Sequence, residues 1–207
     1  MVSSSSLGTV SLPLSLSHEE DKLWKCRLCL SNIEEEELQA NRQYFLHTNE
    51  QAYFSTLLYP KRQHSYLLGR HCAKKAIAAY TGFDNLTEIW IETGIFHYLV
   101  VNHPVLKNIQ VSISHGDTLG AALAFPEAFP MGIDAEEICI NKIGVIERQL
   151  SPAEKKKFSI NNTDGGVSMQ LWTSKEALSK ILKCGLAISF DLLEIDEMEE
   201  KEILLFT

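Results

Sequence analysis

The chain has 207 residues, 45% of them hydrophobic and 22% charged, and its formal net charge is −8 at pH 7. These values are typical of a globular protein with a buried core, either one domain of ordinary size or two small ones. General binding to nucleic acid or to an anionic membrane requires a basic surface, so neither partner is expected. A local basic pocket is compatible with this negative net charge.

The first residues, MVSSSSLGTVSLPLSLS, have no basic segment, and their leucines are interrupted by serines and by Pro13. This pattern differs from a signal peptide, and no apolar run in the chain approaches the ~18 residues of a membrane span. We therefore expect a cytoplasmic protein in which residues 1–20 form a disordered or loosely packed tail.

Five cysteines are spread through segments with regular patterns. Cys26 and Cys29 form a CxxC motif, but no second pair follows at zinc spacing, and KLWKCRLCL alternates as a strand does. Structural, reduced cysteines are therefore expected, with redox or metal binding as the alternative.

Helices are predicted next along the chain. Ser31 followed by Glu34 has the pattern of a capping box, which begins a helix that runs to about Tyr44. Pro60 occupies a favoured first-turn position of a long helix, which Gly82 ends.

Short β-like runs follow, namely LTEIWIE, FHYLVV, IQVSIS and LGAALAF, and they are separated by turn residues. MGIDAEEI and LAISFDLLEI are interpreted as further strands, and Ser151 with Glu154 restarts a helix. This order predicts an α+β chain of two related halves, joined near residues 116–130. The halves are assigned to residues 21–118 and 119–207.

The segment GIDAEE places Asp134 and Glu136 two residues apart, on the same face of a strand. Adjacent carboxylates repel each other unless a cation or proton lies between them, and hard oxygen ligands suit magnesium. An exposed acidic turn is the alternative. Glu176 and Lys180, one helical turn apart, are either a surface ion pair or part of the same metal site, where Lys180 reaches a phosphate.

The segment KRQHSYLLGRHCAKKA places Arg70 and Lys74 on one helix face, with Arg62 two turns earlier. Clustered cations of this kind bind phosphate, although ordinary surface charge is the alternative for each of them. VSISHGD ends a strand with Ser114 and His115. A histidine there is a base, a metal ligand, a phosphate donor or a packed side chain.

In their order, GRHCAKKA, SISHGD, GIDAEE and WTSKEALSKILKCG resemble the 4′-phosphopantetheinyl transferases of the surfactin and enterobactin synthetase type. The resemblance runs from about Lys61 to Leu186, and GID-x-E and W-x-x-KEA-x-x-K are distinctive together. It implies a magnesium-dependent holo-[acyl-carrier-protein] synthase with two pseudo-symmetric α+β halves and coenzyme A between them. Such an enzyme transfers phosphopantetheine to a serine of an apo acyl or peptidyl carrier protein and releases 3′,5′-ADP.

The resemblance also implies site residues by motif position. The magnesium ligands would be Asp134, Glu136 and Glu176. Coenzyme A would be held by Arg62, Arg70, Lys74, Ser114, His115 and Lys180. The catalytic residues would be Glu176, as the base for the serine proton, and Lys180, which neutralises the pyrophosphate. We expect a monomer.

Two departures from the family motivate an alternative. TGIFHYLVVNHP replaces the basic Gly-Lys-Pro-like segment that usually precedes the histidine motif, and the sequence stops at Thr207, so a short second half is expected. The alternative is a non-catalytic module that binds coenzyme A or a carrier protein. A magnesium-dependent hydrolase of a nucleotide diphosphate fits the same chemistry but not the motif order. The intact acids and Lys180 favour the transferase.

Overall fold

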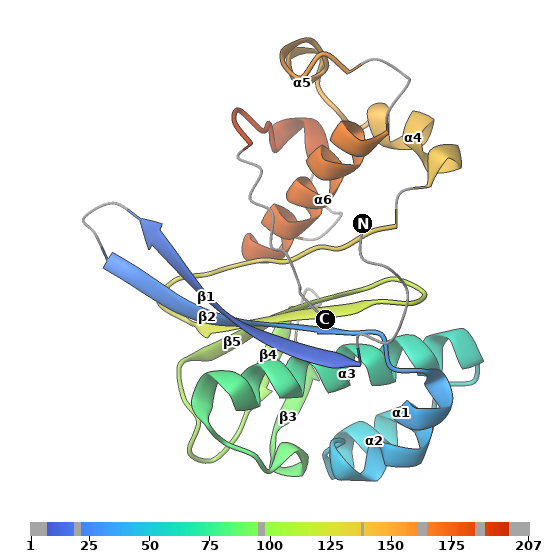
Figure 1. The fold of residues 1–207 in the computed structure, drawn as a ribbon, viewed down its shortest axis with the longest axis vertical. Coiled ribbons are helices and arrows are strands. Elements are labelled where there is room, and N and C mark those ends of the chain that lie inside the picture. The colour runs from blue at the N-terminus through green and yellow to red at the C-terminus, as the bar shows by residue number, and fades with distance from the viewer. Residues whose placement is uncertain are drawn as a thin grey trace.

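The structure is a computed structural model that describes residues 8–18, 22–94, 98–137, 139–160, 165–184 and 189–198. An antiparallel four-stranded sheet, in the order β1-β2-β6-β5, lies between two groups of helices (Figure 1). A separate antiparallel pair is formed by β3 and β4. The strands are β1 (Thr9–His18), β2 (Lys22–Ser31), β3 (Trp90–Thr93), β4 (Leu99–Asn102), β5 (Ile109–His115) and β6 (Gly120–Pro126). The predicted α+β class is confirmed.

The helices divide between the two sides of this sheet, with α1, α2 and α3 on one side and α4, α5 and α6 on the other (Figure 1). Their bounds are Glu35–Asn41 (α1), Thr48–Phe54 (α2), Pro60–Thr81 (α3), Ile140–Glu147 (α4), Pro152–Lys157 (α5) and Gly166–Ile181 (α6). Pro60 begins α3 as predicted, and Gly82 ends it in the left-handed conformation that glycine adopts without strain. The predicted capping box of Ser151 and Glu154 begins α5.

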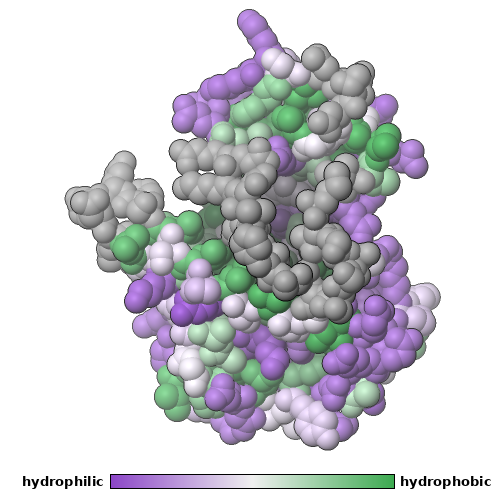
Figure 2. Space-filling model, in the orientation of Figure 1, coloured by the Kyte–Doolittle hydropathy of each residue, from purple (hydrophilic) through white to green (hydrophobic). Residues whose placement is uncertain are grey.

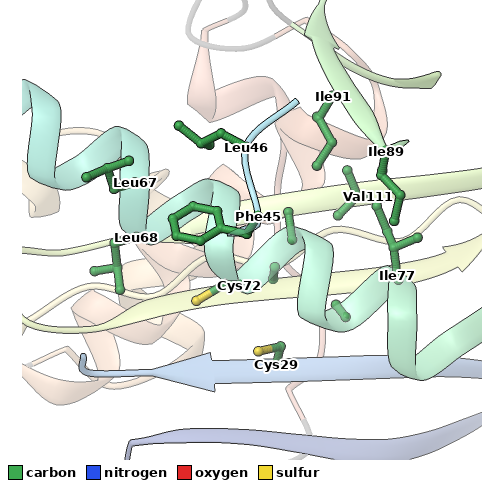
Figure 3. Close-up of a cluster of buried hydrophobic side chains, with 14 of the residues drawn as sticks. Cys29, Phe45, Leu46, Leu67, Leu68, Cys72, Ile77, Ile89, Ile91 and Val111 are labelled. Carbon is green, nitrogen blue, oxygen red and sulfur yellow. The ribbon is translucent and has the colours of Figure 1, made fainter. Parts of the chain in front are cut away.

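The main core lies between α3 and the sheet. Small side chains of β6, Ala122 and Ala124, allow α3 to approach closely, and both are fully buried. Figure 3 shows this core, where Cys72 of α3 and Cys29 of β2 point toward each other. Because successive strand residues face opposite sides, Cys26 packs in a second cluster on the far face. All five cysteines are free, and the two cysteines of the CxxC motif pack in different clusters on opposite faces of the sheet.

Two predictions near the N-terminus are wrong. Residues 9–18, expected to belong to a tail, form β1 and pair along their whole length with β2. Ser31 begins no helix, because it ends β2 and its hydroxyl group is hydrogen-bonded to that of Thr9. The helix α1 begins four residues later and has no side-chain cap.

Neither of the two strands predicted in the second half is found in the part of the chain that the structure describes. Residues 131–137 of MGIDAEEI are extended without strand pairing. Residues 186–188 of LAISFDLLEI lie outside the described residues, and Phe190–Leu192 form a 3₁₀ turn. Among the described residues after Pro126 there is no strand.

β6 lies between β2 and β5 in one sheet, so Pro126, within the predicted join of residues 116–130, is a better end for the first half than residue 118. The first half therefore includes residues up to Pro126. The pseudo-symmetry of the two halves stays a prediction.

The described helices include none that combines the length and the apolar character needed to cross a membrane. On the face drawn in Figure 2, hydrophilic and apolar side chains are mixed at both ends of the molecule. Among the residues drawn there in colour, apolar side chains form several small patches rather than one continuous surface.

Candidate functional site

A pocket of about 410 Å³ is lined by residues of α3, β5 and the end of α6. This volume lies within the range of small-molecule sites. Its polar wall includes Arg62, Arg70, His115, Lys180 and Lys183. Its apolar wall includes Leu99, Val111, Phe125, Met131 and Ile181. The pocket is thus suited to a ligand that carries both negative charge and apolar surface.

Gly69 allows α3 to lie close to β5 at this pocket. A Cβ atom at Gly69 would lie 3.2 Å from Cγ2 of Ile113 and 3.3 Å from Cδ2 of His115. The glycine of GRHCAKKA therefore places Arg62 and Arg70 on the same pocket wall as His115.

Arg70 belongs to a buried cluster of three charges. Its Nε atom lies 3.3 Å from Oε1 of Glu50, and its guanidinium group lies 4.8 Å from the centre of the Tyr66 ring. The ammonium group of Lys74 contacts the same Glu50 carboxylate and donates to the carbonyl oxygen of Leu86 at 3.1 Å. Because one carboxylate faces two cations, Arg70 presents excess positive charge to the pocket.

Lys74 does not reach the pocket, although it was predicted to bind coenzyme A. Its side chain has 0% exposure. Burial lowers the pKa of Lys74 to about 8, although the neighbouring Glu50 carboxylate opposes this shift. Lys74 therefore supports Arg70 through Glu50, and a phosphate contact through Lys74 is not available in this structure.

His115 ends β5, as predicted, and lines the pocket. Burial lowers the pKa of His115; a backbone hydrogen bond opposes this, and the positive charges of Arg62 and Lys180 add to it. The imidazole is therefore neutral near pH 7, where it can donate a hydrogen bond to a phosphate.

Asp134 lies beside the pocket, and its side chain is 6% exposed. Its Oδ1 atom accepts hydrogen bonds from Ser114 Oγ at 2.9 Å and from Lys180 Nζ at 2.8 Å. Lys180 Nζ also donates to the carbonyl oxygens of Ile113 at 3.1 Å and Ile133 at 2.8 Å. Asp134 Oδ2 is buried and has no hydrogen-bond partner among the described residues.

Gly132 explains how Asp134 comes within reach of α6. A Cβ atom at this position would lie only 2.2 Å from the backbone oxygen of Ala177. No side chain fits at that distance, so the glycine of the GID motif lets the segment lie directly against the helix that carries Lys180.

Glu176 lies one turn before Lys180 on α6 and is half-buried. Burial raises the pKa of Glu176, the Asp134 charge and the more exposed Glu136 raise it further, and Lys180 opposes the shift. The three carboxylates predicted to bind metal are therefore close enough to repel one another.

These carboxylates are suited to a hard divalent cation, because such ions prefer oxygen ligands and would relieve the repulsion between the negative charges. Asp134 Oδ2, which has no hydrogen-bond partner among the described residues, is free to bind such an ion. In the part of the chain that is described, no three acidic, histidine or cysteine side chains have already converged to hold an ion.

Two further residues of the predicted motifs lie away from the pocket wall. Ser114 is buried, and its hydroxyl group faces Asp134. Lys175, which precedes Glu176 in the KEA motif, has 0% exposure and pairs with Glu154 of α5. Its role is structural.

The sequence did not single out two aromatic residues of the pocket. Tyr66 lies against Arg70, and Lys183 Nζ lies 4.5 Å from the centre of the Tyr98 ring. Position on α3 could have identified Tyr66, four residues before Arg70 on the same helix face. No local pattern identifies Tyr98.

Fold and site together define an α+β protein in which a cation-lined pocket adjoins a cluster of acidic side chains. Residues 130–207 match the family model of the 4′-phosphopantetheinyl transferase superfamily. The predicted family resemblance is thereby confirmed over these residues, which include Asp134, Glu136, Glu176 and Lys180. No curated protein matches the chain.

Two solved structures are similar over part of the chain. One is a holo-(acyl-carrier-protein) synthase from Bacillus anthracis str. Ames in complex with CoA (3′,5′-ADP), with 19% identity, a TM-score of 0.43, and coverage of 48% of this chain and 93% of that one. The other is a holo-ACP-synthase from Plasmodium yoelii, with 21% identity, a TM-score of 0.37, and coverage of 44% and 82%. The α+β class stated above rests on the strand pairings and helices themselves.

Proposed function

We propose that this protein is a holo-[acyl-carrier-protein] synthase, which transfers the 4′-phosphopantetheine group of coenzyme A to a serine of an apo carrier protein. The observation that best supports the proposal is that Lys180 both lines the pocket and donates a hydrogen bond to Asp134. A cation-lined pocket thereby adjoins an acidic cluster, as phosphoryl transfer requires. The family match over residues 130–207 supports the same activity.

The pocket chemistry suits coenzyme A. Arg62, Arg70 and His115 are proposed to hold the 3′-phosphoadenosine end, because guanidinium groups and a neutral imidazole donate to phosphate oxygens. The excess positive charge of the cluster behind Arg70 favours an anionic ligand there. The apolar wall suits the adenine ring or the pantetheine arm.

In the proposed reaction, the carrier serine oxygen forms a bond to the phosphorus that bears pantetheine, the bond from this phosphorus to the bridging oxygen breaks, and 3′,5′-ADP leaves. The three N–H groups of Lys180 are already donated to Asp134 and to two backbone carbonyl oxygens, so Lys180 would stabilise the negative charge on the bridging oxygen through its positive charge. Glu176 accepts the serine proton, and its raised pKa suits a base that works near neutral pH. A magnesium ion held by Asp134, Glu136 and Glu176 would neutralise the pyrophosphate charge.

The proposal is tested by incubating the protein with coenzyme A, magnesium and a panel of apo carrier proteins, followed by intact-protein mass spectrometry. We expect one carrier protein to gain the mass of phosphopantetheine at its serine, and chelation of magnesium to abolish the gain. Binding of coenzyme A without transfer to any carrier would instead support the non-catalytic module.

The coenzyme-binding part of the proposal is tested with Arg62→Gln, because Arg62 is exposed and its loss should leave the fold intact. A contact with the 3′-phosphate lies far from the reacting phosphorus, so KM for coenzyme A should rise about ten- to a hundredfold while kcat changes little. The preference for coenzyme A over dephospho-coenzyme A should fall in parallel. Lys61→Gln is the matched control, since Lys61 pairs with Asp117 and does not line the pocket.

A further inference from the structure

Ser112 and Ser114 hold the segment that carries Asp134 against β5. They alternate along the strand with Val111 and Ile113, which pack toward α3. Ser112 Oγ accepts a hydrogen bond from the backbone N–H of Ile133 at 3.1 Å. Ser114 Oγ accepts one from the backbone N–H of residue 135, also at 3.1 Å. Two hydroxyl groups thus replace the backbone ladder that this extended segment lacks.

Ser114 makes a contact that Ser112 does not make. Its hydroxyl group donates to Asp134 Oδ1 at 2.9 Å, and the carbonyl oxygen of Ala135 is a more distant acceptor at 3.4 Å. A serine has one hydroxyl proton, so a proton engaged by Asp134 is not available to a ligand phosphate. Ser114 is 8% exposed, and it does not line the pocket, whereas its neighbour His115 does.

The two carboxylate oxygens of Asp134 differ in their hydrogen bonds. Ser114 and Lys180 both donate to Oδ1, so the carboxylate is fixed by one oxygen from two directions. Oδ2 is buried and has no partner within the described residues. A buried carboxylate oxygen without a partner is costly unless a cation or a proton reaches it.

We propose that Ser114 is a positioning residue that fixes Asp134 through Oδ1 and leaves Oδ2 to bind the divalent cation, and that it does not contact coenzyme A. This inference rests on the proposed function, because the cation is the one that the transfer requires. Residues that orient metal ligands affect metal affinity about ten- to a hundredfold when they are replaced.

The test is Mn²⁺ binding to the full chain in the presence of saturating coenzyme A, measured from the electron paramagnetic resonance signal of free Mn²⁺. We expect Ser114→Ala to raise the Mn²⁺ dissociation constant about ten- to a hundredfold. Ser112 also lines the pocket, but it makes no contact to Asp134, so at saturating coenzyme A the Mn²⁺ dissociation constant of Ser112→Ala should stay within about threefold of wild type. Ser114→Thr, which keeps the hydroxyl group, should restore most of the affinity.

Melting temperatures of the two alanine variants show whether lost stability, rather than lost positioning, weakens Mn²⁺ binding. Equal Mn²⁺ affinity of Ser114→Ala and wild type would overturn the positioning role. So would a loss of preference for coenzyme A over dephospho-coenzyme A in Ser114→Ala, because the serine would then contact the coenzyme. If either result is found for Ser114→Ala while wild type still transfers phosphopantetheine, the positioning role is wrong and the proposed function stands. A wild type that binds no Mn²⁺ would overturn both the positioning role and the proposed function.

Discussion

Lys175 and Glu154 form an ion pair in which neither side chain is exposed, with Lys175 Nζ 2.7 Å from Glu154 Oε2. The same ammonium group donates to the carbonyl oxygen of Phe190 at 2.8 Å. Glu154 accepts two further hydrogen bonds, from the backbone N–H groups of Ser151 and Ile195, both at 2.8 Å. The pair therefore joins α5, α6 and the segment after α6, and it orients the helix that carries Glu176 and Lys180.

Breaking this pair should destabilise the protein strongly, because either single change leaves an uncompensated buried charge. We expect Lys175→Met and Glu154→Gln each to lower the free energy of unfolding by about 3–5 kcal/mol in urea denaturation. The double variant should cost less than the sum of the two, since no unpaired charge remains. Lys156→Met, on the exposed side of α5, should change stability by less than about 0.5 kcal/mol. Full additivity of the two single variants would show that the residues do not interact.

Gly132→Ala should separate the GID segment from α6, because the added Cβ atom would lie 2.2 Å from the Ala177 backbone oxygen. Overpacking against backbone of this kind should cost about 3 kcal/mol and should also reduce any transfer activity. Gly144→Ala is the matched control, since a Cβ atom there has no neighbour within 4 Å. In the middle of α4 it should stabilise the protein by about 0.5–1 kcal/mol. Thermal denaturation of both variants measures the difference, and equal melting temperatures would contradict the close packing.

Much of the fold can be predicted from local pattern, but long-range pairing decides the exceptions. Pro60 and Gly82 bound their helix because their backbone preferences are local. The serine–leucine alternation of residues 9–18 has the period of a strand, yet only a partner such as β2 turns it into one. Ser31 had the pattern of a cap, but its hydroxyl group is used by Thr9, across the sheet.

The sequence motifs identify residues that line or adjoin the pocket, but not the contacts that these residues make. Asp134, Lys180 and His115 lie where the motifs indicate, because their spacing along the chain is set by the elements that carry them. The roles of Lys74 and Ser114 depend on partners distant in sequence, Glu50 and Asp134 respectively. No local pattern specifies such partners.

Stability should fall in mild acid because of His71. Burial lowers the pKa of His71 from 6.5 to about 4, and the nearby Lys75 charge adds to the shift. Between pH 6.5 and pH 4 the unfolded chain therefore binds this proton and the folded chain does not. The free energy of unfolding should decrease by about 3 kcal/mol across this range on account of His71 alone.

The acid dependence is measured by urea denaturation of wild type and His71→Leu at several pH values. The leucine keeps an apolar contact with Phe45, whose ring meets that of His71 edge to face. The stability difference between the two proteins should shift in favour of His71→Leu as the pH falls below 6.5. A difference that stays constant from pH 7 to pH 4 would show that His71 is protonated as readily in the folded chain as in the unfolded one.

We propose that the acidic cluster beside the pocket supports magnesium-dependent phosphopantetheine transfer. The most direct measurement is the transfer rate of Glu176→Gln at saturating magnesium, which keeps the shape of the side chain but removes its charge and its capacity to accept a proton. We predict that kcat falls about a thousandfold with an unchanged melting temperature, whereas Glu137→Gln, an acid of the same GIDAEE segment, stays within about twofold of wild type. A rate for Glu176→Gln within about tenfold of wild type, which corresponds to only ~1.4 kcal/mol of barrier, would contradict the account.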